Sequence, residues 1–312
     1  ASCDWSSDVC SSDLLSMVVD YSQWDIYDGF SEGSGRSEKI WLTNHETKEI
    51  GLFKYTKSDR TTEHVSEKLA SDLAGLLGLK CAKIEIGRYK SRIGSMSYLI
   101  NDETEILIEG IYLINKNYPS YDSYTMYDNE NKEYYSIEMI LKSLAEYNLS
   151  NDFFRISIFD FLIGNTDRHQ NNWAVLESDN GIRICPIYDN GSSLCCYFEE
   201  KNIDFYLGND KVRFNSVVNS KSKSRIRVDK KIKKEPTHIE MLKYIKSNHS
   251  ECVMDLIKVI DKKITEVSLD KIMFNYSEEL ISDRRKKLIK RFLIEKVKLM
   301  NDIFLGACRI QK

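Results

Sequence analysis

The order of strand-like and helix-like patterns along the chain constrains its fold most strongly. Residues 20–105 consist of short alternating segments with one amphipathic helix among them, whereas most of the later chain has helical periodicity. Ile40–Asn44 and Ile50–Tyr55 flank the polar turn His45–Glu49, which predicts a β-hairpin. We therefore expect an α+β architecture in which a small antiparallel β lobe precedes a larger helical lobe.

The spacing of apolar residues predicts the other elements. Thr61–Leu79 has helical spacing and stops at Gly78, and Ala82–Gly87 with Ile93–Ile100 predicts a second hairpin. The later chain predicts helices at Tyr135–Tyr147, Asp152–Ile163 and Ser282–Phe304, and strands at Trp173–Glu177 and Ile182–Tyr188. The helix that begins at Asp152 is apolar on nearly every side, so we expect it to be buried.

Composition excludes several classes of protein. The 312 residues are 42% hydrophobic and 30% charged, which is ordinary for a globular chain and excludes a disordered chain, a collagen-like fibre and a coiled-coil rod. No apolar run approaches the roughly 18 residues that a membrane span needs, so we expect a soluble protein with no membrane partner. The net charge of −3 does not favour nucleic acid as a partner of the whole molecule.

The first fourteen residues form a segment that we expect to be an artefact. Residues 1–14 show neither helical nor strand periodicity and resemble a translated sequencing adapter, so the true N-terminus is expected to be missing. Two of the eight cysteines, Cys3 and Cys10, lie in this segment. The other six form no C-x-x-C pair, and no secretory signal precedes them. We therefore expect reduced thiols and a cytoplasmic location.

Basic residues are concentrated in one segment. Residues 211–240 carry ten Lys/Arg against three acidic residues, which gives the segment a charge of +7 and leaves −10 for the rest of the chain. Two interpretations stay open, a docking surface for an anionic partner and a mobile solvated loop.

The segment that most clearly indicates chemistry is GNTDRHQNNW, residues 164–173. Asp167 and Asn172 lie on a tight loop between a predicted helix and a predicted strand, and Asp189 closes the later strand in PIYDNG. One carboxylate can orient or deprotonate a hydroxyl, while an amide oxygen and a second carboxylate are hard ligands for Mg²⁺. The pattern suits Mg²⁺-dependent phosphoryl transfer, with Asp167 catalytic and Asn172 and Asp189 as metal ligands.

The β-rich half offers groups that could bind phosphate. Lys54 lies on the apolar strand GLFKY, where its ammonium can reach inward or, alternatively, point into solvent. Glu63 or Glu67 of the following helix could pair with it, and we choose Glu67 because it precedes the apolar run by one turn. The Gly/Ser loop 33–39 could cover nucleotide phosphates with its N–H groups, and Lys39 could be a second phosphate contact.

At these motifs the chain resembles the HipA-like serine/threonine kinases, a bacterial branch of the protein-kinase-like fold. Asn165–His169 with Asn171 and Asn172 resembles the family's N-T-D-x-H-x-K-N loop, and Pro186–Asp189 resembles its terminal Y-D. Residues 34–39 resemble its phosphate loop, and Ser66–Ala70 its Glu-bearing helix. The match extends over about residues 25–300.

The resemblance implies a bilobal kinase with an N-lobe at 15–105 and a C-lobe at 106–312. It implies ATP and Mg²⁺ as cofactors and a protein Ser or Thr hydroxyl as acceptor of the γ-phosphoryl group. The residues that it assigns to ATP binding are Ser34, Gly35, Arg36, Ser37, Lys39, Lys54, Glu67, Tyr98, Leu99, Ile100, His169, Asn172 and Asp189. Ser97–Asn101, the strand-to-hinge segment, would hold adenine through its backbone, and His169 would line the nucleotide site or brace its loop.

Three departures from the family pattern affect the expected partners. The kinase lobe starts almost at once, so we expect no antitoxin partner, and we expect a monomer. Asn171 replaces the family's Lys, and Asp189-Asn190-Gly191 differs from the D-F-G of ordinary protein kinases, which leaves a lipid or a small alcohol open as acceptor. Ser34 and Ser37 are candidate autophosphorylation sites. A pseudokinase is the further alternative, disfavoured because Lys54, Asp167, Asn172 and Asp189 are all present.

Overall fold

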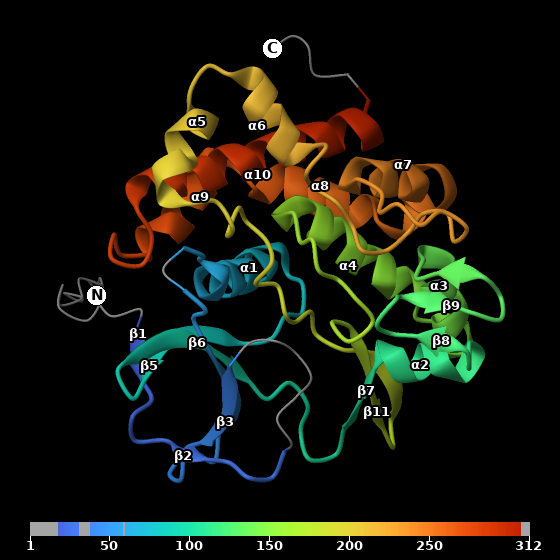
Figure 1. Cartoon of the computed structure of the whole chain (residues 1–312), viewed down its shortest axis with the longest axis horizontal. Coiled ribbons are helices and arrows are strands. Elements are labelled where there is room, and N and C mark those ends of the chain that lie inside the picture. The colour runs from blue at the N-terminus through green and yellow to red at the C-terminus, as the bar shows by residue number, and fades with distance from the viewer. Residues whose placement is uncertain (1–17, 31–37, 59, 307–312) are drawn as a thin grey trace, which may run out of the picture.

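The chain folds into a β-rich lobe and a larger helical lobe, with α1 lying where the two meet (Figure 1). The structure is a computed structural model that describes residues 18–30, 38–58 and 60–306. The proposals made above for residues 1–14 and for Ser34, Gly35, Arg36 and Ser37 lie outside the described residues. The α+β architecture expected from the sequence is the one observed.

A six-stranded sheet forms the first lobe, with the strand order β1-β5-β6-β4-β3-β2. Its strands are β1 (Val18–Asp20), β2 (Asp25–Ile26), β3 (Lys39–Thr43), β4 (Ile50–Tyr55), β5 (Ile84–Tyr89) and β6 (Arg92–Tyr98). Both predicted hairpins are present as β3–β4 and β5–β6. The sheet is not wholly antiparallel as expected, because β1 pairs with β5 in parallel.

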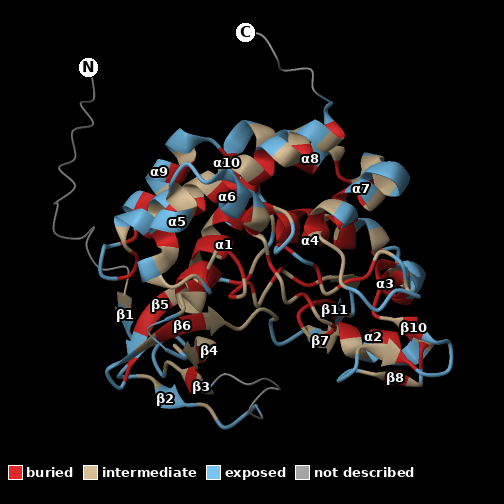
Figure 2. Cartoon of the chain, turned by 45° about the horizontal axis from the view of Figure 1, so that its top comes forward, coloured by how far each residue is buried: buried red, intermediate tan, exposed pale blue. Residues whose placement is uncertain are grey.

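Helix α1 (Glu63–Leu77) joins the sheet to the helical lobe. It ends at Gly78, whose φ of 74° is the left-handed conformation that glycine adopts without strain. Leu69 and Leu73 are fully buried and share one hydrophobic core with Ile86 of β5 and with the helical lobe. Helix α1 is thereby fixed between the sheet and the helical lobe, and much of it is buried (Figure 2).

The helical lobe packs around two helices, α4 (Ser150–Ile163) and α10 (Asp283–Phe304). Its helices are α2 (Gly110–Asn117), α3 (Ile137–Leu144), α4 (Ser150–Ile163), α5 (Ile203–Leu207), α6 (Lys211–Val218), α7 (His238–His249), α8 (Met254–Lys263), α9 (Glu266–Phe274) and α10 (Asp283–Phe304). Most of α4 is buried, as its all-round apolar sequence predicts. The long α10 contacts α4 and α5 to α9, so it is the scaffold of this lobe (Figure 1).

The described residues also form two three-stranded sheets, which lie near α2 and α3 (Figure 1). One has the order β12-β11-β7 and contains β7 (Ile106–Glu109), β11 (Ala174–Ser178) and β12 (Gly181–Ile184). The other contains β8 (Tyr121–Asp122), β9 (Tyr127–Asp128) and β10 (Glu133–Tyr134). The strand predicted at 182–188 ends at Ile184, two residues before Pro186, which has no N–H to donate.

The basic segment is attached to the helical lobe at several points, although many of its side chains are exposed. Its first part forms α6, and Arg227 further along is buried, with its guanidinium donating to the Arg225 carbonyl at 2.7 Å. Arg227 N–H also bonds the Tyr135 carbonyl at 3.0 Å. The segment is therefore packed into the helical lobe.

Two observations bear on the environment of the chain. Among the residues that the structure describes, no helix is long and apolar enough to cross a membrane. The described cysteines carry free thiols, and burial raises the pKa of the Cys81 thiol to about 11.

Candidate active site

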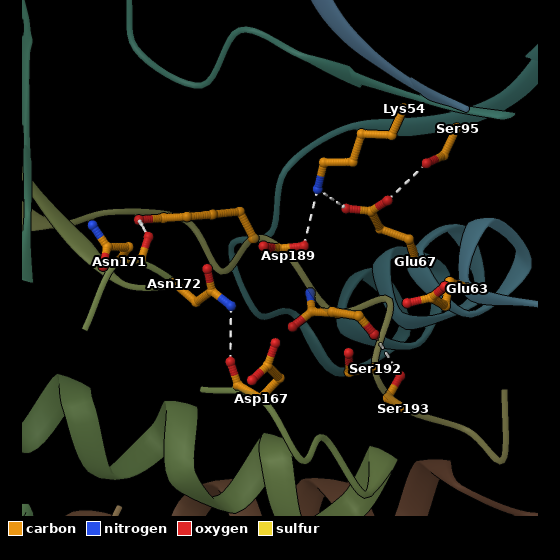
Figure 3. Close-up of polar contacts among 12 residues, drawn as sticks. Lys54, Glu63, Glu67, Ser95, Asp167, Asn171, Asn172, Asp189, Ser192 and Ser193 are labelled. Carbon is orange, nitrogen blue, oxygen red and sulfur yellow. Dashed lines mark hydrogen bonds and ion pairs between the residues drawn. The ribbon is translucent and has the colours of Figure 1, made fainter. Parts of the chain in front are cut away.

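Lys54 connects the two lobes through two carboxylates. Its Nζ lies 2.8 Å from Oε1 of Glu67 on α1 and 2.9 Å from Oδ1 of Asp189 in the helical lobe (Figure 3). Ser95 on β6 donates to the other Glu67 oxygen at 2.7 Å, which fixes that carboxylate. Burial alone would lower the pKa of the Lys54 ammonium, but Asp189 and Glu67 outweigh it and raise that pKa above its usual value. The ammonium is therefore held charged.

The other acidic candidate of the first helix has a different role. Glu63 lies at the start of α1 and pairs with Lys57 at 3.0 Å, while Tyr197 OH donates to it at 3.0 Å. Glu67 is one turn further along, on the side that faces β4 and β6. Of the two glutamates considered, Glu67, our choice from the sequence, is the one that pairs with Lys54.

Asp189 sits in a strained backbone conformation. Its φ is 54°, a region that non-glycine residues adopt rarely and that clusters at functional sites. The segment before it is pinned by Ile187 N–H, which bonds the Lys80 carbonyl at 2.9 Å. Burial would raise the pKa of Asp189, yet Lys54 lowers it below its usual value, so the group is a carboxylate at neutral pH.

The loop that carries Asp167 begins at a glycine that no other residue could replace without strain. Gly164 ends α4 with φ 67°, and a Cβ there would lie 2.7 Å from the Phe292 ring on α10. Asn165 then turns the chain, because its side chain donates to Asp160 at 3.0 Å and accepts from Asp167 N–H at 3.1 Å. These hydrogen bonds hold the loop in one conformation.

Arg168 is the centre of this rigidity. It is 1% exposed and forms a bidentate pair with Asp160 of α4 at 2.7 and 2.9 Å. It also donates to the Asn172 and Tyr188 carbonyls at 2.5 and 2.7 Å. One guanidinium therefore fixes α4, the Asp167 loop and the segment that ends at Asp189 relative to one another.

Asn172 and Asp167 face the same cleft as Lys54. The Asn172 amide donates to the Asp167 carbonyl at 2.8 Å, and its oxygen is turned away toward the side where Asp189 lies (Figure 3). The Asp167 side chain is 38% exposed, and one of its oxygens accepts from Arg225 Nε at 3.2 Å. A carboxylate in this position can accept a hydrogen bond from a hydroxyl group bound in the cleft.

The cleft between the lobes has a volume of about 900 Å³ and is lined by every described residue proposed for the site. Those residues are Lys39, Lys54, Glu67, Tyr98, Leu99, Ile100, Asp167, His169, Asn172 and Asp189. Lys39 lies opposite Lys54 in the β3–β4 register. The fold therefore gathers these residues at one site.

In the strand-to-hinge segment, two of the backbone N–H groups expected to face adenine are already hydrogen-bonded within the protein. Tyr98 N–H bonds the Lys83 carbonyl at 3.0 Å and Leu99 N–H bonds the Ile50 carbonyl at 2.9 Å. Within the described ranges the Ile100 N–H has no such partner. Adenine held through this segment would therefore depend on Ile100 N–H and on carbonyl groups.

His169 lies in the wall of the cleft and also braces the loop that carries it. It lines the cleft, and its Nδ1 accepts from Asn171 N–H at 3.2 Å, which braces the loop. Asn171, the residue in place of the family's Lys, donates to Glu109 at 2.7 Å. The Asn171 side chain therefore ties the loop to the end of β7.

Several cleft residues could not be found from the sequence. Leu107 and Glu109 come from β7, which gave no recognised strand signal, and Arg225 lay in a segment judged only by its charge. Arg168 stood inside the recognised motif but received no role. Tyr188 could have been found, since it immediately precedes Asp189.

Comparison with known proteins identifies the family of this chain. Residues 31–253 match the family model described as the HipA-like C-terminal domain. The chain belongs to this family. No curated protein matches the chain.

Two solved structures show the same fold as this HipA-like chain. The proinflammatory kinase CtkA of Helicobacter pylori superposes with a TM-score of 0.76 at 21% identity, covering 92% of this chain and 96% of that one. HipA of Shewanella oneidensis MR-1, solved with HipB and its operator DNA, gives 0.59 at 13% identity, covering 90% and 67%. Family and fold together support a kinase-type function.

Proposed function

We propose that this chain is an ATP- and Mg²⁺-dependent kinase that transfers the γ-phosphoryl group to a Ser or Thr hydroxyl of a protein. The observation that carries the proposal is the position of Lys54. It is held between Glu67 and Asp189 in the cleft that Asp167 and Asn172 also line. A charged ammonium so placed can grip nucleotide phosphates.

The residues present fit ATP and Mg²⁺. Within the described part of the chain, no group of three or more His, Cys, Asp or Glu could hold a metal by itself. Mg²⁺ commonly takes one or two protein oxygens together with substrate phosphates, and Asp189 with the Asn172 amide oxygen supplies such a pair. Bound Mg²⁺ would neutralise the charge of the phosphates.

The chain's own groups would then position the reactants. Lys54 and Lys39 lie on neighbouring strands, where both can face the phosphates, and Leu52, Ile100 and Leu107 provide an apolar lining for the base. Asp167 would accept the proton or the hydrogen bond of the attacking hydroxyl. Because the loop is fixed by Arg168, positioning and electrostatics would supply most of the catalysis.

The test is transfer of label from γ-labelled ATP to protein, compared between the wild type and Asp167→Asn. We expect labelled protein with the wild type and loss of labelling by 100-fold or more, on the order of 10²–10⁴, in the variant. Asp179→Asn, in the exposed β11–β12 turn, is the matched control and should be unchanged. Equal labelling by Asp167→Asn would refute the proposed role.

The same experiment separates the other acceptors. Label confined to the lipid or small-molecule fraction would replace the protein acceptor with an alcohol of that class. ATP binding without any transfer would indicate a pseudokinase.

A further inference from the structure

A short stretch of the basic segment has alternating exposure. Lys221 and Lys223 are exposed, Ser222 and Ser224 between them are buried, and Arg225 is half-buried at the edge of the cleft. The basic side chains therefore share the outer side of this stretch, which we call the Lys221–Arg225 strip.

The strip is anchored rather than loose. Ser224 N–H bonds the Pro236 carbonyl at 2.9 Å, and His238 N–H bonds the Ser222 carbonyl at 2.8 Å. The Ser222 hydroxyl is held from beneath by Lys296 Nζ at 2.7 Å and by His238 Nδ1 at 2.8 Å. Because these hydrogen bonds fix the backbone, the Cα atoms of Lys221 and Lys223 are held in defined positions.

The strip leads directly to the catalytic aspartate candidate. Arg225 Nε is 3.2 Å from Asp167, and its Nη1 is 2.9 Å from Glu235. A fully extended chain spans at most about 3.5 Å per residue, so the Cα atoms of Lys223 and Lys221 lie within about 7 and 14 Å of that of Arg225. Among the described residues, no carboxylate oxygen lies within 4.0 Å of the Lys221 or the Lys223 ammonium.

We infer that the Lys221–Arg225 strip is an acceptor-binding surface for an acidic polypeptide segment that carries the Ser or Thr to be phosphorylated. The inference rests on the proposed kinase function. With the hydroxyl at Asp167, acidic side chains next to it would meet Lys223 and Lys221. An acidic side chain beside the acceptor could also replace Asp167 as the partner of Arg225, which would release that carboxylate for the hydroxyl.

Charge favours a protein over a nucleic acid as the occupant. The strip offers a few positive charges in a row, while the chain outside residues 211–240 carries a net −10. A polyanion longer than the strip would be repelled by that body, whereas a short acidic segment would contact the strip alone.

The test measures binding apart from catalysis. A fluorescent Ser peptide flanked by Glu, the same peptide flanked by Lys, and a single-stranded oligonucleotide are titrated with the full chain and followed by anisotropy. We expect the Glu peptide to bind tightest and to weaken with added salt. Lys221→Gln with Lys223→Gln should weaken its binding on the order of 5-fold, the loss of two exposed ion pairs.

The matched control removes the same charge elsewhere. Lys258→Gln with Lys287→Gln alters two exposed lysines of α8 and α10 and should leave Glu-peptide binding unchanged. Equal binding of the Glu and Lys peptides, equal loss in both double variants, or tighter binding of the oligonucleotide would overturn the inference.

Labelling of the same peptides by γ-labelled ATP distinguishes the two proposals. Selective binding of the Glu peptide without transfer would leave the surface standing and refute the kinase. Equally efficient transfer to the Glu and Lys peptides would support the kinase and refute the surface.

Discussion

Lys54 and Asp189 are separated by 135 positions in the chain and joined by a 2.9 Å ion pair. One lies on the fourth strand of the sheet lobe and the other follows the last strand of the helical lobe. The ion pair therefore exists only when both lobes are folded and correctly placed. The geometry of the proposed phosphate-binding site therefore depends on both lobes.

Replacing Lys54 should strongly lower the rate of phosphoryl transfer. Lys54→Met leaves the Glu67 and Asp189 carboxylates without the cation between them and removes the proposed phosphate contact. We expect phosphoryl transfer to fall on the order of 10²–10³-fold, the usual cost of removing a preorganised charge. Lys258→Met, which alters an exposed lysine of α8, is the control. Comparable rates for the two variants would contradict the assignment.

Arg168 should matter to stability far more than another arginine of similar geometry. Arg168→Met leaves the buried Asp160 carboxylate unpaired, which we expect to lower the free energy of unfolding by about 3–5 kcal/mol. Arg155 pairs with Asp255 at 2.7 Å near the surface, and Arg155→Met should cost about 1 kcal/mol or less. Urea unfolding checks both, and similar losses would show that Arg168 is no structural centre.

Local signals explain why much of the fold was predictable. The β3–β4 hairpin and α1 carry their own periodicity and end signals, so each could be located from its own residues. The Asp167 loop was found because its residue types and spacing are unusual for a simple turn. Its link to Arg225, by contrast, spans 58 positions with no repeating pattern, and only the packed structure reveals it.

The basic segment shows where charge alone misleads. A count of Lys and Arg cannot distinguish a solvated loop from one that alternates between buried Ser222 and Ser224 and exposed lysines. The distinction depends on Lys296, which reaches Ser222 from α10, 74 positions further along. Likewise, β7 pairs with β11 through backbone groups, which leave little trace in a four-residue sequence.

Lys296 predicts a specific dependence of stability on pH. The side chain is fully buried, and burial lowers its pKa to about 7, although Cys195 opposes this. An unfolded lysine keeps its proton up to about pH 10.4, so between these values the unfolded state binds more protons and stability rises with pH. From pH 7 to 8.5 we expect a gain of about 1–2 kcal/mol.

The variant Lys296→Met should remove this dependence. Its free energy of unfolding should be nearly constant over the same interval, and the difference from wild type isolates Lys296 from other titrating groups. His238 titrates below this interval, since burial lowers its pKa well under the usual value. The Cys195 thiol titrates above it, because burial raises its pKa to about 12. Parallel profiles for wild type and variant would show that Lys296 is charged in the folded protein.

We propose that the cleft between the lobes binds ATP together with Mg²⁺, and that Asp189 holds the metal. The most direct measurement is thermal stability with ATP, with Mg²⁺ and with both, for wild type, Asp167→Asn and Asp189→Asn. A ligand at 100 times its dissociation constant stabilises by about 2.7 kcal/mol. We predict that stabilisation needs ATP and Mg²⁺ together, persists in Asp167→Asn and is lost in Asp189→Asn. No stabilisation of the wild type, or the same stabilisation in Asp189→Asn, would contradict the account.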